Sequence, residues 1–163
     1  RNNDRVGAIF FTEEVEELIP SKNGKKHVLS IIESILTYEP KHAGTNITNV
    51  LRIFNRIEKK RSVVFLISDF LDDGYQKELK ASETRHDLIC IRVMDRAEER
   101  IPAGAIFTFE DLETGETYVL DNLKEDLQIN SLNGQPRRNL ISVYTDQDYV
   151  KPLVQFFKSR SRR

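Results

Sequence analysis

The sequence predicts an α/β fold in which a mainly parallel sheet is covered by helices on both faces. Its strongest strand signals are residues 62–68 and 87–93, which are largely apolar and therefore typical of strands covered on both sides. Segments with helical periodicity alternate with the strands, and such an order implies right-handed crossovers between parallel strands. The 163 residues, of which 39% are hydrophobic, suffice for one core, so we predict a single domain over residues 1–163.

The first part of the chain predicts a strand pair. Residues 6–11 are apolar and include aromatic side chains, which predicts a strand. After a tight turn at 12–14, a second and charged strand is expected to run to Pro20. Glu16, Glu17 and Pro20 suit an edge strand, because charges and a missing N–H group both discourage further pairing.

Two amphipathic helices are expected next, over residues 25–38 and 46–60. Each repeats apolar side chains at helical spacing, which predicts one buried face per helix. The apolar side chains of the first helix are Val28, Leu29, Ile32, Ile35 and Leu36, and those of the second are Ile47, Val50, Leu51, Phe54 and Ile57. The second helix is expected to end near Lys59, Lys60 and Arg61, because cations favour the negative end of the helix dipole.

The remaining elements continue the alternation. Between and after the two apolar strands we expect a helix over 75–84, a hairpin of 106–109 with 117–120, a strand over 140–144, and a last helix capped within 145–148. Residues 122–138 are polar and contain Asn133, Gly134 and Pro136, so we interpret them as a loop or a poorly ordered segment.

Charge and composition exclude several classes of protein. The 25 basic and 26 acidic residues leave a net charge of −1, which gives no overall attraction to nucleic acid or to an anionic membrane. The basic residues at 158–163 are interpreted as a solvated tail. The longest apolar run, 63–67, is far too short to span a bilayer. The single cysteine, Cys90, is interpreted as a core side chain, and the lack of an internal disulfide suits a reducing, cytoplasmic location.

Polar residues that follow the strand 62–68 form the first candidate site. In parallel sheets ligands bind outside the carboxyl ends of the strands. Asp69, Asp72 and Asp73 offer three carboxylates there, and carboxylate oxygens are the ligands that Mg²⁺ requires. For Asp72 and Asp73 the alternative is that they form a turn with Gly74 and cap the next helix.

A second candidate segment is residues 42–47, in which Gly44 permits a tight backbone path and Thr45 or Asn46 begins a helix. The simpler interpretation of Thr45 is an N-cap, in which its hydroxyl accepts a hydrogen bond from a backbone amide. Thr45 and Asp69 together, however, can face the same crevice, because one lies in a loop and the other at the end of a strand.

Four segments carry a resemblance to a known family, namely 6–11 (VGAIFF), 44–47 (GTNI), 64–72 (VFLISDFLD) and 144–150 (YTDQDYV). Together they resemble the bacterial family catalogued as domain of unknown function 58, which has a von Willebrand factor A-like fold. The resemblance implies a Rossmann-like three-layer sandwich, and a metal-ion-dependent adhesion site in members that keep all of its motifs. It also implies association with MoxR-type AAA+ ATPases, and it implies no established enzymatic activity.

Within that resemblance, Thr45 matches the threonine motif of the adhesion site and Asp69 matches its later aspartate, so these two residues are the candidate metal ligands. The first motif of the site, Asp-x-Ser-x-Ser, has no match here. The resemblance therefore implies that the first strand and first helix of the domain lie upstream of Arg1, and that Mg²⁺ binds in the intact protein rather than in this chain alone. Because a sheet without its central strand has an open edge, we expect the chain to be part of a longer polypeptide or to borrow a strand.

The leading hypothesis is a non-catalytic protein-binding module that presents Thr45 and Asp69 to a partner such as a MoxR-type AAA+ ATPase, with Mg²⁺ completing the contact. The common catalytic signatures do not occur in the sequence. The alternative is a Mg²⁺-dependent phosphoryl-transfer hydrolase, in which Asp69 acts as ligand or nucleophile and Asp72 or Asp73 assists. Nucleic-acid binding is the weakest interpretation, because the net charge is close to zero.

Overall fold

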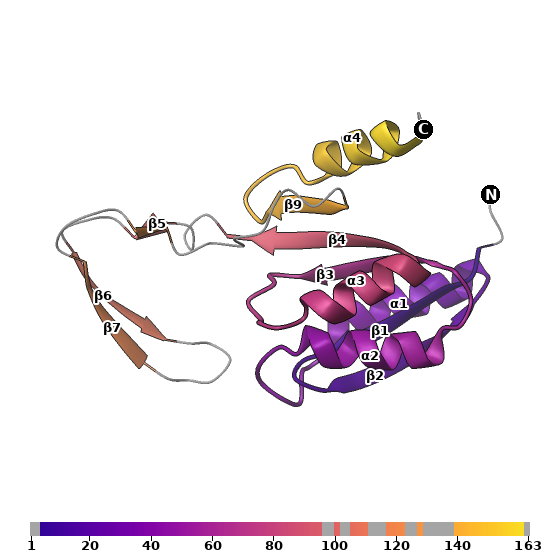
Figure 1. Cartoon of the computed structure of the whole chain (residues 1–163), viewed down its shortest axis with the longest axis horizontal. Coiled ribbons are helices and arrows are strands. Elements are labelled where there is room, and N and C mark those ends of the chain that lie inside the picture. Colours follow the sequence, from indigo (N-terminus) through magenta and orange to yellow (C-terminus); the bar gives the residue numbers. More distant parts are fainter. Residues whose placement is uncertain are drawn as a thin grey trace. The chain divides into compact units, whose positions relative to one another are not determined.

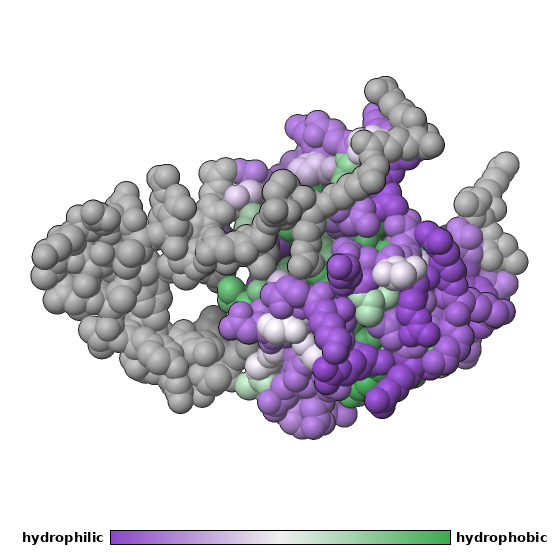
Figure 2. Space-filling view, in the orientation of Figure 1, coloured by the Kyte–Doolittle hydropathy of each residue, from purple (hydrophilic) through white to green (hydrophobic). Residues whose placement is uncertain are grey.

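The computed structural model describes residues 4–95, 100–101, 105–110, 117–122, 127–128 and 139–161. The chain divides into two compact units, one made of Arg1–Lys59 with Asp72–Leu79 and the other of Lys60–Leu71 with Lys80–Arg163. Most of the described surface visible in Figure 2 is hydrophilic, with smaller hydrophobic areas between. No helix among the described residues is both long enough and apolar enough to cross a membrane.

The first unit contains an antiparallel strand pair and two helices. The strands and helices are β1 (Val6–Phe11), β2 (Val15–Lys22), α1 (Lys25–Thr37) and α2 (Ile47–Ile57). α1 contacts β1 and α2 contacts β2. The predicted strand pair is therefore confirmed, although β2 continues through Pro20 for two residues more than expected.

α1 forms where the apolar periodicity predicts it, but the burial expected for its apolar face is wrong. Leu29, Ile32, Ile35 and Leu36 are exposed, and Ile31 is the residue of α1 that is buried. The axes of two paired strands lie only about 5 Å apart. Such a narrow ribbon covers only part of a helix that is about 10 Å across with its side chains.

The burial predicted for the apolar face of α2 agrees with the structure better than that predicted for α1. Ile47, Val50 and Leu51 are buried, but Ile57, also expected on the inner face, is 51% exposed and is the last residue of the helix, three residues before the expected end. The side chain of Asn46 accepts a hydrogen bond of 2.8 Å from the backbone N of Asn49, which makes Asn46 the N-cap. The interpretation of Thr45 as the cap is therefore wrong, and the helix begins one residue later.

The second unit contains a parallel three-stranded sheet, and this confirms the mixed α/β class with a parallel sheet. The sheet has the order β3-β4-β9, and Figure 1 shows α4 beside β9. The elements are β3 (Val63–Ser68), β4 (Asp87–Met94), β9 (Leu140–Tyr144) and α4 (Val150–Ser161), while α3 (Gln76–Arg85) begins in the first unit and ends in the second. The further expectation of a three-layer von Willebrand A-like sandwich stays a prediction.

The core of the second unit lies between this sheet and α4. Ile89 from β4 and Ile141 and Val143 from β9 are buried, and Leu153 and Phe156 of α4 pack against them. Because α4 covers β4 and β9, one face of β3 stays open. The prediction that helices cover both faces of β3 is therefore wrong for the described residues.

Polar contacts fix both ends of α4. Asp148 Oδ1 accepts a hydrogen bond of 2.9 Å from the backbone N of Val150, as the predicted cap requires. At the other end Arg160 forms an ion pair with Asp87 and lies over the ring of Phe156, 5.5 Å from its centroid. The interpretation of 158–163 as a solvated tail is thus wrong for Arg160, and residues 162–163 lie outside the described residues.

Short antiparallel strands lie between β4 and β9 in the sequence. β6 (Ala105–Glu110) pairs with β7 (Thr117–Asn122), which confirms the predicted hairpin. β5 (Arg100–Ile101) pairs with β8 (Leu127–Gln128), so the loop predicted over 122–138 is wrong for these two residues and for Asn122, which belongs to β7. Residues 123–126 and 129–138 lie outside the described residues.

Candidate functional site

Asp69 directly follows β3, at the carboxyl end of a parallel strand. Its Oδ1 atom accepts hydrogen bonds from Ser68 Oγ at 3.2 Å and from the backbone N of Leu71 at 3.1 Å. Among the described residues, Oδ2 accepts no hydrogen bond. One oxygen of this carboxylate is therefore anchored to the turn, while the other is available to a ligand.

The turn after Asp69 is held in an unusual conformation. Phe70 has a φ of 64°, in the left-handed region that costs an L-residue about 1–2 kcal/mol. Its side chain is only 5% exposed, and its backbone N donates to Ser68 Oγ at 3.0 Å. Burial of the aromatic ring offsets the conformational cost, so the backbone that carries Asp69 is fixed.

Arg92 lies beside this turn on the neighbouring strand. It is paired in register with Ser68 and is 8% exposed. Its Nε atom donates a hydrogen bond of 3.3 Å to the backbone carbonyl of Asp69. The buried guanidinium of Arg92 therefore helps to hold the backbone of the turn that carries Asp69.

Asp72 has a different role, because both of its oxygens accept backbone hydrogen bonds. Oδ2 accepts from the N of Ile47 at 2.7 Å and Oδ1 accepts from the N of Asp73 at 2.7 Å. A carboxylate at this place satisfies an orphan amide and complements the helix dipole. Capping by Asp72 was predicted, but for the next helix along the chain, whereas the structure assigns it to α2.

Replacing Asp72 by asparagine is expected to lower the free energy of unfolding by about 1–2 kcal/mol, because the charge that faces the start of α2 is lost. Urea denaturation followed by circular dichroism measures the change. Asp73→Asn removes an exposed carboxylate next to it and is expected to leave stability within about 0.5 kcal/mol. Equal losses in both variants would contradict the assignment of the cap.

Thr45 is half-buried in the segment that leads into α2. Gly44 before it has a φ of 82°, which confirms the tight backbone path predicted there. Thr45 belongs to the first unit and Asp69 to the second. Their predicted action at one metal therefore stays a prediction. The described residues contain no group of three His, Cys, Asp or Glu side chains placed to hold a metal ion.

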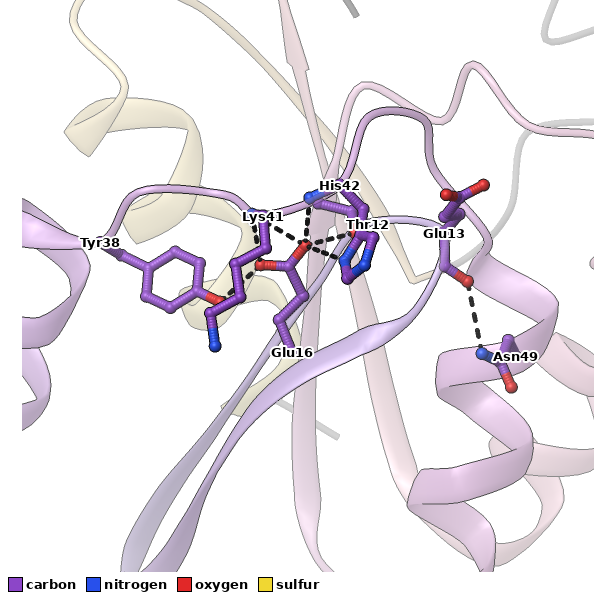
Figure 3. A network of polar contacts seen from close by, with 7 residues as sticks. All are labelled: Thr12, Glu13, Glu16, Tyr38, Lys41, His42 and Asn49. Atoms are coloured by element: carbon purple, nitrogen blue, oxygen red, sulfur yellow. Dashed lines mark hydrogen bonds and ion pairs between the residues drawn. The ribbon is translucent and has the colours of Figure 1, made fainter.

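The most heavily bonded carboxylate of the first unit is Glu16, which lies on the predicted edge strand. Among the described strands β2 pairs with β1 alone, as an edge strand does, but the side chain of Glu16 is only 1% exposed and is not a solvated edge charge. Figure 3 shows hydroxyl, backbone and ring groups directed at it. Tyr38 Oη donates at 2.6 Å, Thr12 Oγ1 at 2.8 Å, and the backbone N of His42 at 2.9 Å. The backbone N of Lys41 and His42 Nδ1 lie at 3.0 and 3.1 Å.

These donors determine the ionisation of the cluster. Hydrogen bonding, above all from Tyr38, holds the pKa of Glu16 well below its usual range. The same bond raises the pKa of Tyr38 to about 12. Glu16 is therefore a fixed anion at neutral pH and Tyr38 a neutral donor. Since a general acid or base works best with a pKa near the operating pH, this cluster ties residues 38–42 to β2 rather than transferring protons.

A family model described as "Protein of unknown function DUF58" matches residues 1–132, well over half of the chain.

Curated relatives are uncharacterized mycobacterial proteins. Mb1516 of Mycobacterium bovis and Rv1480 of Mycobacterium tuberculosis are each 25% identical over 177 residues, which cover 98% of this chain and 55% of theirs. MAV169 of Mycobacterium avium is 26% identical over 163 residues, which cover 88% of this chain and 94% of its own. The chain thus spans about half the length of the first two relatives.

A solved structure shares the fold. The conserved hypothetical protein BatB from Bacteroides thetaiotaomicron superposes with a TM-score of 0.54 at 15% identity, covering 100% of this chain and 82% of that one. At this level of identity the likeness concerns the fold alone.

Proposed function

We propose that this chain, which belongs to the DUF58 family of proteins of unknown function, is a non-catalytic protein-binding module. The observation that carries the proposal is the geometry of Asp69. Its Oδ1 is anchored by Ser68 and Leu71 while Oδ2 accepts no described hydrogen bond, at the strand end where such folds bind ligands. A carboxylate oriented in this way suits coordination of a hard cation or a donor group of a partner protein.

The other carboxylates near the two candidate segments support a binding role over catalysis. Both oxygens of Asp72 cap backbone amides, and the pKa of Glu16 lies too low for proton transfer at neutral pH. Of the two carboxylates that the hydrolase alternative offers to assist Asp69, Asp72 is thus engaged as a cap, and Asp73 is the one left for that role.

The proposal places Mg²⁺ between Asp69, Thr45 and the partner, following the resemblance to metal-dependent adhesion sites. Because the described residues hold no three-ligand cluster, these two residues do not form a metal centre by themselves. In the proposal the remaining ligands come from the missing first motif, on a polypeptide extended upstream. The partner proposed, again from the resemblance, is a MoxR-type AAA+ ATPase.

A titration of Mg²⁺ and Mn²⁺ tests the metal. We expect heat release and a higher melting temperature in a version extended upstream to include the first motif, and no response in this chain alone. Asp69→Ala in the extended version is expected to abolish the response, whereas Asp73→Ala keeps it. The partner is tested by surface plasmon resonance between the extended version and the ATPase, with and without Mg²⁺.

Equal partner binding by Asp69→Ala and by the parent, in the presence and absence of Mg²⁺, would refute the metal-bridged contact. A metal-stimulated phosphatase activity that disappears in Asp69→Asn would instead support the hydrolase.

A further inference from the structure

The segment that carries Thr45 is anchored on both sides to the region where β1 turns into β2. On one side, the backbone N of His42 donates a hydrogen bond of 2.9 Å to the carboxylate of Glu16, near the start of β2. On the other side, the backbone N of Asn46 donates a hydrogen bond of 2.9 Å to the carbonyl O of Thr12. Thr45 thus lies in a short span between two fixed points.

Thr12 is the residue that joins these two points. Its Oγ1 atom donates a hydrogen bond of 2.8 Å to Oε1 of Glu16, and the same oxygen accepts the bond from the backbone of His42 (Figure 3). The carbonyl O of Thr12 accepts the bond from Asn46. The side chain and the backbone of one residue therefore hold both ends of the span that contains Thr45.

The turn that carries Thr12 is itself held in place. Its backbone N donates to the carbonyl O of Glu14 at 2.9 Å, and Asn49 of α2 donates through Nδ2 to the carbonyl O of Glu13 at 3.3 Å. Among the residues that the structure describes, the hydroxyl of Thr45 takes part in no hydrogen bond. The span is thus fixed through its backbone, while this hydroxyl is left available to a ligand.

We propose that Thr12 is a positioning residue for Thr45. Its hydroxyl, through Glu16, and its carbonyl, through Asn46, hold the backbone of Thr45 where the Thr45 hydroxyl meets a ligand. Such preorganisation raises affinity, because the ordering of the ligand-bearing segment is complete before binding. The inference rests on the proposed function, in which Thr45 contributes to the metal-bridged contact, and Thr12 acts on that contact through its neighbours.

The order of the Thr45 backbone is measured first, by nitrogen-relaxation NMR of this chain. Thr12→Val replaces the hydroxyl by a methyl group of similar size, so it removes the bond to Glu16. We expect the order parameter of the Thr45 amide to fall in Thr12→Val and to return to the parent value in Thr12→Ser, which keeps the hydroxyl. Thr37→Val removes a hydroxyl that donates to the carbonyl O of Glu33 at 2.9 Å, and it is expected to change nothing at Thr45.

The affinity for Mg²⁺ is then measured by calorimetry in the version extended upstream. Thr12→Val is expected to raise the dissociation constant about tenfold, and Thr12→Ser is expected to restore it. Ile31→Val is the control for a purely structural loss, because it removes a methyl group at a buried position of α1, outside the span. This control is expected to bind Mg²⁺ as the parent does.

The two measurements separate the positioning role from the proposed function. A fall of order at Thr45 in Thr12→Val supports the positioning role even if the extended parent gives no response to Mg²⁺, a result that would refute the metal-bridged contact instead. An unchanged order parameter at Thr45 in Thr12→Val would overturn the positioning role. An equal loss of Mg²⁺ affinity in Thr12→Val and Ile31→Val would overturn it as well, because the effect would then follow global stability.

Discussion

Replacing Glu16 by glutamine is expected to lower the melting temperature more than any other single carboxylate substitution in the first unit. The buried carboxylate accepts from two hydroxyls, two backbone amides and a histidine ring. An amide of the same size offers only one acceptor oxygen, and its NH₂ group faces further donors. A buried donor that loses its acceptor lowers the stability of the folded state by the full free energy of its desolvation. The variant is therefore expected to release the segment 38–42 from β2.

Differential scanning calorimetry measures this change, and Glu14→Gln provides the matched control. Glu14 lies on the turn between β1 and β2 and is exposed, so its substitution is expected to leave the melting temperature nearly unchanged. Hydrogen exchange at the amides of Lys41 and His42 is expected to accelerate in Glu16→Gln. Unchanged exchange at these two amides would show that the carboxylate does not hold the segment.

The same cluster makes stability depend on pH in two windows. A glutamate whose pKa is lowered by folding stabilises the protein above its unfolded pKa, and this contribution is lost as pH falls from about 4.3 toward the lower folded value. Acidification is thus expected to destabilise the parent more steeply than Glu16→Gln. Tyr38 behaves in the opposite sense. Its pKa is raised to about 12, so stability is lost as pH rises above about 10, and Tyr38→Phe is expected to remove this loss.

The sequence predicts the elements well because each has a local signal. The apolar periods of 25–38 and 46–60 locate α1 and α2, and the run at 62–68 locates β3. What it cannot predict is which element covers which face. Burial depends on the partners that the tertiary structure supplies, and the periodicity of a helix is the same whether or not a partner is present. For this reason the apolar stripe of α1 and the open face of β3 were both expected to be buried.

In the candidate site, too, the sequence predicts the features that have local signals and misses those that depend on residues distant in the chain. Asp69 and Gly44 are found from motif and turn chemistry, since both lie at defined ends of predicted elements. Glu16 was missed, because its donors come from Thr12 and from residues 38–42, more than twenty positions further along the chain. A charged residue in a short strand gives no sign of such distant donors. Asp72 was predicted as a cap but assigned to the adjacent helix, because its true partner, Ile47, is equally distant in sequence.

Replacing Gly7 by valine is expected to lower the free energy of unfolding by about 3 kcal/mol, although valine favours strands and glycine weakens them. The reason is a close approach of backbone. A Cβ atom at Gly7 would lie 2.8 Å from the carbonyl O of Ile19 and 3.0 Å from the N of Ser21. Between the pairs Val6–Lys22 and Ala8–Ile19 the register shifts, so β2 crowds against β1 at this point.

Chemical denaturation distinguishes this steric effect from strand propensity, because the two predict opposite signs. Val6→Ile adds one methyl group to the same strand at a side chain that is 40% exposed, and it is expected to be nearly neutral. If Gly7→Val were as stable as the parent, β1 and β2 would have to move apart without cost. A loss of stability in Gly7→Val alone assigns to this glycine the role of allowing β2 to approach β1 closely at Ile19 and Ser21.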